Sequence, residues 1–316
     1  MFNKLIISNL LLFSRNSLNL LPIVFYVVFV TSCASLTKSQ LQRVTNLTVA
    51  SDTIIATPKM IFNELTTVRL ERGLYYAASL SSASAREKEI NALAVASVAD
   101  EQLVNRTEVY INVLNSYLRA LRSISADTRW KAYGTEWRGI GRNIDSLILR
   151  FNQTDLIETT IPVGWAKLSG QYMGYLNERF MRVRQAKAVR TFVTEGDALV
   201  GACTEGLVEL LKKGDLIELI ENESAGLKNN YEAYLHRLEL SGQPANMEAD
   251  RKYIELVKRI EAAKKSRSRC VTALQSLRRA HAKLVEELKK KQHVDFMIDE
   301  LLELNTLSLY LQDMLK

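Results

Sequence analysis

Histidine, cysteine and carboxylate side chains supply most catalytic and metal-binding groups, and this sequence places few of them at useful spacings. Its three histidines are scattered at positions 236, 281 and 293. The sequence contains no His-Glu-x-x-His, no Gly-x-Ser-x-Gly, no phosphate-binding glycine loop and no Cys-x-x-Cys. We therefore predict that the protein is not an enzyme and that it holds no metal ion or other cofactor.

The remaining titratable groups on helical segments have structural interpretations. His281 lies on an apolar helical face with no second histidine at helical spacing, which favours a core position over a ligand or a general base. Glu218, Glu221 and Glu223 are interpreted as a solvated helix face. Carboxylate-bridged metal sites in helical bundles use Glu-x-x-His pairs, and this sequence has none.

A basic segment between residues 179 and 190 contains no acid and interleaves its charges with apolar side chains. This pattern favours one of two structures. The first is an amphipathic contact with anionic lipid head groups, and the second is a solvated helix face whose acidic partners lie elsewhere in the bundle. The candidate residues for the anionic-surface contact are Arg179, Arg182, Arg184, Lys187 and Arg190.

A helical segment that starts at residue 127 places Trp130, Tyr133 and Trp137 on one face. Aromatic residues three and four apart are typical of a core stripe, but they could also form a platform for a sugar polymer. A pocket lined by Trp130, Trp137 and Trp165 would support ligand binding, whereas solid packing there would contradict it.

The first 32 residues contain Lys4 and Arg15 but no acid, and they end in a dense apolar run over residues 20–30. A positive segment followed by a short apolar run is typical of an export signal, because a spanning helix needs about 20 apolar residues. The next residues, Val30-Thr31-Ser32-Cys33, resemble the lipobox of bacterial lipoproteins. The resemblance implies that the signal is removed before Cys33 and that Cys33 carries the lipid anchor.

An uncleaved signal anchor over residues 18–36 is the alternative, and both interpretations place the rest of the chain outside the cytoplasm. Ala34 follows the cysteine where the sorting rule of enterobacterial lipoproteins would need Asp for inner-membrane retention. That resemblance implies the outer membrane of a bacterial cell envelope, facing the periplasm. Export also argues against nucleic acid as the partner of this basic chain, whose formal net charge is +7.

A five-residue run, Leu70-Glu71-Arg72-Gly73-Leu74, is similar to a short signature in the nitrate-sensing helical bundle domains of bacterial receptors. The similarity covers only these residues, and no cytoplasmic signalling module follows them. It implies a role in ligand sensing.

Composition predicts the fold class. The 316 residues include only 13 Gly and 4 Pro, whereas many-stranded folds need frequent turns rich in both. Apolar residues recur every three or four positions from Tyr253 to Leu288, which is typical of a coiled-coil-like seam. We predict an all-α protein, an elongated antiparallel helical bundle with coiled-coil-like long helices.

The predicted helices cover residues 58–82, 86–125, 127–152, 163–193, 195–240, 247–291 and 294–315. Pro58 is interpreted as the first residue of a helix, Thr194 as a break, and Ser241-Gly242-Gln243-Pro244 as the tip of a helical hairpin. The predicted domains are a signal peptide over residues 1–32, a membrane-proximal tether over 33–57 and a helical bundle domain over 58–316.

Two cysteines remain after the anchor, Cys203 and Cys270, and we predict that they are not bonded to each other. With a hairpin tip near Gln243, position 203 precedes it by forty residues and position 270 follows it by twenty-seven. The mismatch corresponds to about 20 Å of helix, which a disulfide cannot span. A chain reversal at Gly214 would reset this register.

Function is predicted from the anchor together with helices that lack a chemical site. The leading hypothesis is a lipid-anchored envelope protein that acts as a structural, tethering or accessory subunit. It would contact the membrane through lipidated Cys33 and bind a protein partner or further copies of itself. The alternatives are a binding module for a small ligand or cell-wall polymer between helices, and a membrane-active helical protein.

Overall fold

The computed structural model describes residues 36–126, 134–153, 163–165, 178–212, 214–290 and 298–314. Across these ranges the chain forms helices and no strand. They are α2 (Lys38–Ser79), α3 (Ala83–Ser125), α4 (Gly134–Asn152), α6 (Glu178–Lys212), α7 (Gly214–Leu240), α8 (Met247–Lys290) and α9 (Ile298–Met314). The prediction of an all-α protein is confirmed.

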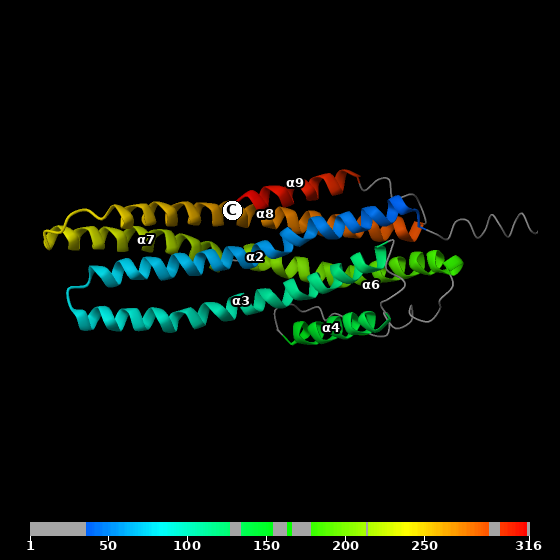
Figure 1. Cartoon of the computed structure of the whole chain (residues 1–316), viewed down its shortest axis with the longest axis horizontal. Helices are drawn as coiled ribbons and strands as arrows, with labels where there is room; N and C mark the ends of the chain where they lie inside the picture. Colours follow the sequence, from blue (N-terminus) through cyan, green and yellow to red (C-terminus); the bar gives the residue numbers. More distant parts are fainter. Residues whose placement is uncertain are drawn as a thin grey trace, which may run out of the picture.

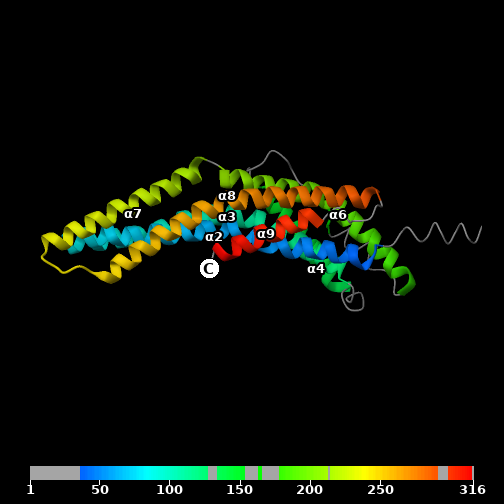
Figure 2. The same cartoon turned by 90° about the horizontal axis from the view of Figure 1, so that it is seen from above.

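The long helices run side by side along one axis of the molecule (Figure 1). A short turn joins α2 to α3, which runs back along it, and α8 returns along α7 and α6. α9 packs against α2 and α8 (Figure 2), and α4 packs against α3 (Figure 1). α2 is therefore the central helix, since it contacts α3, α7, α8 and α9.

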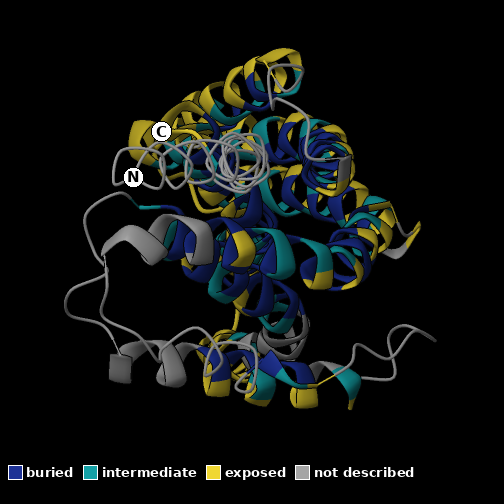
Figure 3. Cartoon of the chain, turned by 90° about the vertical axis from the view of Figure 1, so that its right-hand side faces the viewer, coloured by how far each residue is buried: buried dark blue, intermediate teal, exposed yellow. Residues whose placement is uncertain are grey.

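The apolar seams of these helices meet in one continuous core. Leu47 and Ile54 of α2, Leu114 of α3, Leu199 of α6 and Leu274 of α8 are all fully buried in it. In a view along the long axis, the buried side of each helix faces its neighbours (Figure 3). Because each helix buries one stripe, its opposite face remains exposed to solvent.

The start of α2 differs from the prediction. α2 begins at Lys38, where Thr37 and Gln40 form a capping box with hydrogen bonds of 2.8 and 3.2 Å. Pro58 lies inside the helix instead of starting it. Residues 38–57, predicted as a tether, therefore belong to the bundle and contribute Val44 and Leu47 to its core.

α6 corrects two further boundaries. The helix runs through the expected break at Thr194, and the expected single helix over 195–240 is two helices, α6 and α7. Gly196 does not end α6 because the ring of Tyr117 packs directly over its Cα, in space that a Cβ would occupy. A glycine at this position allows α3 and α6 to pack closely, and the packing outweighs its helix-breaking tendency.

The hairpin tip is where the sequence predicts it. Gly242 adopts a left-handed conformation with φ of 66°, and the amide of Gln243 donates to Leu238 O at 3.1 Å. These contacts end α7 with a glycine in the position that needs positive φ. α8 then begins at Met247, as predicted.

Cys203 and Cys270 are free thiols, both buried in the core. Their predicted separation was calculated by treating residues 195–240 as one uninterrupted helix. The structure instead divides this segment into α6 and α7, so the calculated distance no longer applies. Among the helices in the described ranges, none is long and apolar enough to cross a membrane.

Candidate functional site

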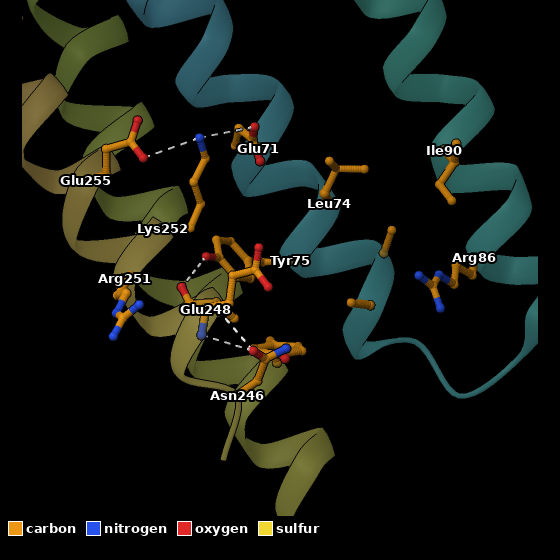
Figure 4. Close-up of a pocket in the computed structure, with 14 residues that line it drawn as sticks. Glu71, Leu74, Tyr75, Arg86, Ile90, Asn246, Glu248, Arg251, Lys252 and Glu255 are labelled. Carbon is orange, nitrogen blue, oxygen red and sulfur yellow. Dashed lines mark hydrogen bonds and ion pairs between the residues drawn. The ribbon is translucent and has the colours of Figure 1, made fainter. Parts of the chain in front are cut away.

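A cavity of about 710 Å³ opens where the end of α2, the start of α3 and the α7–α8 hairpin meet (Figure 4). It lies at the end of the molecule opposite the start of α2 (Figure 1) and is termed the tip pocket. The residues that line it are Glu71, Leu74, Tyr75, Ala77, Ala78, Arg86, Ile90, Tyr234, Asn246, Glu248, Ala249, Arg251, Lys252 and Glu255.

The α3 wall of the tip pocket is positioned by a helix cap. Ser82 Oγ accepts a hydrogen bond from the amide of Ala85 at 3.4 Å and starts α3. Arg86 and Ile90 then lie one turn apart and face the end of α2 (Figure 4). This wall therefore presents one cation and one apolar side chain to the cavity.

The α8 wall is positioned in the same way. The side-chain oxygen of Asn246 accepts hydrogen bonds from the amides of Glu248 and Ala249 at 3.1 and 3.3 Å and caps α8. Glu248, Lys252 and Glu255 follow at spacings of four and three, which places them on one side of α8. Figure 4 shows this side turned toward α2.

Tyrosine rings close the floor of the tip pocket. Tyr75 packs against Tyr231 and Tyr234, with ring centres 5.3 and 5.5 Å apart, and its hydroxyl donates to Ala249 O at 2.7 Å. Burial and the nearby charge of Glu71 raise the pKa of Tyr75 to about 12. The phenol is therefore neutral and fixed in a structural hydrogen bond, so it serves as a rigid wall.

Part of the charge in the tip pocket is already neutralised. Lys252 Nζ lies 3.6 Å from a carboxylate oxygen of Glu71 and 3.6 Å from one of Glu255. Hydrogen bonding from Arg259, followed by the charge of Lys252, lowers the pKa of Glu255. Lys252 thus links α2 to α8 through its contacts with these two carboxylates.

Three further charges in the tip pocket have no such partner. Arg86, Arg251 and Glu248 are exposed, and they form no ion pair with any side chain in the described ranges. Cations therefore stand on both the α3 and α8 walls, and one free carboxylate stands at the start of α8. An arrangement of this kind can bind a ligand through ion pairs.

The lining of the tip pocket includes no cysteine, serine, threonine or histidine, and the phenol of Tyr75 is held neutral. Its charged groups are carboxylates, arginines and a lysine, and these can bind a ligand of opposite charge.

A buried hydrogen-bond network lies elsewhere, between α3, α6 and α8. Tyr117 Oη donates to His281 Nε2 at 2.7 Å, and His281 Nδ1 donates to Asp197 Oδ1 at 3.3 Å. Arg278 donates to the same carboxylate oxygen at 2.6 Å. The chain of contacts fixes the Nδ1–H tautomer of a neutral imidazole.

The protonation states in this network follow from its surroundings. Desolvation lowers the pKa of His281 and raises that of Tyr117 well above its usual value. The hydrogen bond from His281 and the contacts with Arg278 lower the pKa of Asp197 to about 2. The prediction that His281 is a core residue is confirmed, but its two polar partners were not foreseen.

The rings of Trp165 and Phe192 close the network from solvent. They pack on Tyr117 with ring centres 5.8 and 5.5 Å from it, and His281 is fully buried. Of the three tryptophans considered for a ligand pocket, Trp165 is thus packed solidly in the core. Trp130 and the side chain of Trp137 lie outside the described residues.

Glu223 corrects the prediction of a solvated carboxylate face. Glu218 and Glu221 are exposed as expected, but the side chain of Glu223 is 1% exposed. It accepts a hydrogen bond from Arg69 at 2.7 Å and another from Arg72, both on α2. The ion pair joins α7 to α2 beside Glu71, which lines the tip pocket.

Residues of the Leu70–Leu74 run line the tip pocket or join α2 to its neighbouring helices. Glu71 and Leu74 line the tip pocket, and Arg72 binds Glu223. Gly73 has no room for a side chain because Leu93 of α3 packs against it. The run therefore brings α2 close to α3 and α7 beside the pocket.

The other predicted site residues are not brought together with the tip pocket. Cys33 and the side chains of Arg179, Arg182 and Arg184 lie outside the described residues. Farther along α6, Lys187 is exposed and Arg190 is partly buried. The predicted anionic contact therefore stays a prediction.

The described residues contain no group of three or more His, Cys, Asp or Glu side chains placed to hold a metal ion. Comparisons with protein-family models, with curated proteins and with solved structures return no match to this chain.

Proposed function

We propose that the protein is a lipid-anchored helical component of a bacterial cell envelope, and that it acts as a tether or accessory subunit by binding another protein at its tip. The proposed anchor is Cys33, and the proposed location is the outer membrane, facing the periplasm. The proposal extends the leading sequence-based hypothesis by naming the surface that binds.

The observation that carries the proposal is the position of the tip pocket relative to the proposed anchor. α2 begins five residues after Cys33, and Glu71 lies near the other end of the same helix. The thirty-three residues from Lys38 to Glu71 correspond to about 50 Å of α-helix. A protein attached at one end and binding at the other has the geometry of a tether.

The chemistry of the tip supports binding at that end. Arg86, Arg251 and Glu248 have no ion-pair partner within the described part of the chain, and Leu240 and Met247 are 68% and 65% exposed beside the hairpin turn. Exposed apolar side chains next to unpaired charges are typical of a protein-binding surface.

The test is affinity purification of the tagged full chain from envelope membranes of its host. Arg86→Glu combined with Arg251→Glu should abolish the recovery of a stoichiometric partner. Arg119→Glu combined with Lys212→Glu is the matched control, because these cations are exposed, lack ion pairs among the described residues and lie away from the tip. Equal partner recovery with both pairs of substitutions would rule out the tip as the binding surface.

A small ligand is a second candidate for the same pocket, favoured by its volume of about 710 Å³ and its mixture of free cations and a free carboxylate. The class of ligand that fits is a zwitterion such as an amino acid or a short peptide. Its carboxylate would pair with Arg86 or Arg251, and its ammonium group with Glu248.

Thermal unfolding separates the two candidates. A ligand present at one hundred times its dissociation constant stabilises the folded state by about 2.7 kcal/mol. If one compound from a panel of amino acids and dipeptides is the ligand, it should raise the Tm of the wild-type chain. The same compound should leave the Tm of the Arg86→Glu chain unchanged. A flat Tm across the panel, with partner recovery intact, would leave the protein-binding tip as the function.

A further inference from the structure

α9 packs along only the C-terminal half of α8 (Figure 2). In the covered half, Arg279 donates to Glu303 at 3.1 Å and Lys283 pairs with Glu300. α8 therefore presents basic side chains here, and the helix that covers them is acidic.

The exposed side of the N-terminal half of α8 is not covered by α9 and repeats this chemistry. Its large apolar side chains are exposed: Met247 by 65%, Ile254 by 53% and Val257 by 39%. Its cations, Arg251, Lys258 and Lys265, are spaced seven residues apart and form no ion pair with the described residues. We define the α8 outer face as Met247, Arg251, Ile254, Val257, Lys258 and Lys265.

α9 carries a complementary face that is also exposed. Ile298, Leu302 and Leu309 are 50%, 59% and 62% exposed, and they lie opposite the side of α9 that packs on α8. The whole helix has four acids and no basic residue. We define the α9 outer face as Ile298, Asp299, Leu302, Leu309 and Asp313.

The spacings of the two faces match when the helices run parallel. With Leu302 placed beside Ile254, the same register brings Asp299 beside Arg251. It also brings the last acid of α9 beside Lys265, because both intervals are fourteen residues. Apolar contacts at the centre would then be flanked by opposite charges, which is the pattern that fixes register between helices.

Within one chain the two faces cannot meet, because α9 lies along the other half of α8. We infer that the α8 outer face binds the α9 outer face of a second copy of this chain. The proposal goes beyond the tip-binding function and competes with it, because Arg251 and Met247 belong to both surfaces and the dimer places the start of α2 of one copy beside the tip of the other. Arg86→Glu alone changes the tip but not the α8 outer face, so it should abolish partner binding at the tip and leave the dimer intact. Each copy offers both faces, so the contact forms twice in a symmetric dimer.

The arrangement of α9 on its own α8 is compatible with a closed dimer. α9 runs antiparallel to α8, since Glu300 meets Lys283 while Tyr310 meets Arg269, with 3.1 Å between the guanidinium carbon and the ring centre. A two-fold axis perpendicular to α8 near residue 266 reverses the second copy. Its α9 then lies parallel to the first α8, as the register requires, and the two contacts close without leaving a free face.

In-cell cysteine crosslinking of the full chain tests the dimer. Ile254→Cys combined with Leu302→Cys should give a disulfide-linked dimer in envelope membranes after mild oxidation, and either substitution alone should not. Val49→Cys combined with Leu149→Cys is the matched control, since these residues are 53% and 51% exposed. The native Cys203 and Cys270 are buried and should not react.

Charge reversal provides the second measurement. Arg251→Glu with Lys265→Glu should weaken dimerisation by roughly tenfold, because each copy places like charges opposite one another at both contacts. Adding Asp299→Lys and Asp313→Lys to that chain should restore the dimer. Both pairs lie on exposed surface, so circular dichroism should be unchanged.

A dimer specific to the 254–302 cysteine pair and rescued by the second charge reversal supports the proposal. Equal crosslinking by the control pair would overturn it, and so would a monomer mass in detergent for the wild-type chain. Crosslinks from the α8 outer face to a different protein, or its protection by anionic lipid alone, would overturn it in favour of that other occupant.

Discussion

At the scale of single residues, the buried carboxylate of Glu223 is the group whose removal we expect to be most costly near the tip. It neutralises Arg69 and Arg72, which are each 27% exposed. Glu223→Ala would remove the buried carboxylate that both guanidinium groups bind, which should lower the free energy of unfolding by about 2–3 kcal/mol. Urea denaturation measures the change.

Glu221 gives the control for that substitution, because it lies on the same helix but is exposed. Glu221→Ala should change stability by less than about 0.5 kcal/mol. If the two alanine variants unfolded at the same urea concentration, the Glu223 ion pair would contribute nothing beyond a surface contact.

His281 predicts a pH dependence of stability. Desolvation by burial, together with the charge of Arg278, lowers its pKa in the folded state below the value of about 6.5 expected in the unfolded chain, and outweighs the opposing contact with Asp197. As the pH falls below about 6.5, the unfolded chain takes up this proton first. Stability from this group is therefore complete above pH 6.5 and declines below it, by at most about 1.4 kcal/mol per pH unit.

His281→Gln should flatten the decline between about pH 6.5 and 5, since the amide does not titrate. The contribution of Asp197, whose pKa is lowered to about 2, is lost only at much lower pH and does not interfere. His236→Gln is the control, because its side chain is 68% exposed. Urea midpoints measured from pH 5 to 8 for the three chains check the assignment, and an unchanged decline in His281→Gln would contradict it.

At the scale of elements, the interior proline of α2 has a specific partner on α8. Pro58 has no N–H, so the carbonyl of Ile54 one turn earlier lacks its helical donor. The thiol of Cys270 fills this position, with Sγ 3.8 Å from Ile54 O. A buried carbonyl without a donor would cost free energy, so the cysteine compensates for the proline.

A double-mutant cycle tests this compensation. Cys270→Ala should destabilise the wild-type chain more than it destabilises Pro58→Ala, in which the amide of residue 58 supplies the missing donor. The coupling should be about 0.5–1 kcal/mol, measured from unfolding free energies. Val271→Ala, also in the core beside it, should show no coupling to position 58, and equal costs for Cys270→Ala in both backgrounds would exclude the contact.

The all-α fold class and the ends of α8 could be predicted from the sequence because both depend on local patterns. The seam from Tyr253 to Leu288 and the turn at Gly242 both lie within short windows of sequence. The predicted helix start at Pro58 and the predicted break at Thr194 were wrong because distant residues override the local tendencies there. Cys270 contacts the carbonyl that Pro58 leaves without a donor, and Tyr117 packs on Gly196 beside Thr194.

The tip pocket could not be predicted for the same reason. Its walls come from residues 71–90 and 234–255, and only the pairing of α2 with α8 brings them together. Glu223 was assigned to the surface because its helical neighbours Glu218 and Glu221 are acidic. Periodicity alone does not reveal two arginines more than 150 positions earlier in the chain.

At the scale of the whole molecule, the sequence predicts where the chain is attached. Cys33→Ala should abolish incorporation of a labelled fatty acid and leave the signal segment uncleaved, because the lipobox resemblance implies that this cysteine is acylated and that the signal is cut before it. Intact mass spectrometry of the envelope fraction measures both effects. An uncleaved, unacylated wild-type chain would instead favour the signal anchor over residues 18–36.

The central position of α2 also has a consequence for biogenesis. A chain is synthesised from its amino end, so α2 is complete long before α7, α8 and α9, the helices that cover much of it. The apolar face of α2 must wait for α7, α8 and α9 until residues beyond 214 have been made. The core therefore cannot form helix by helix as the chain is synthesised. The nascent chain is therefore a natural client for holding chaperones, and a truncation that removes α8 and α9 should yield an aggregation-prone fragment rather than a smaller folded protein.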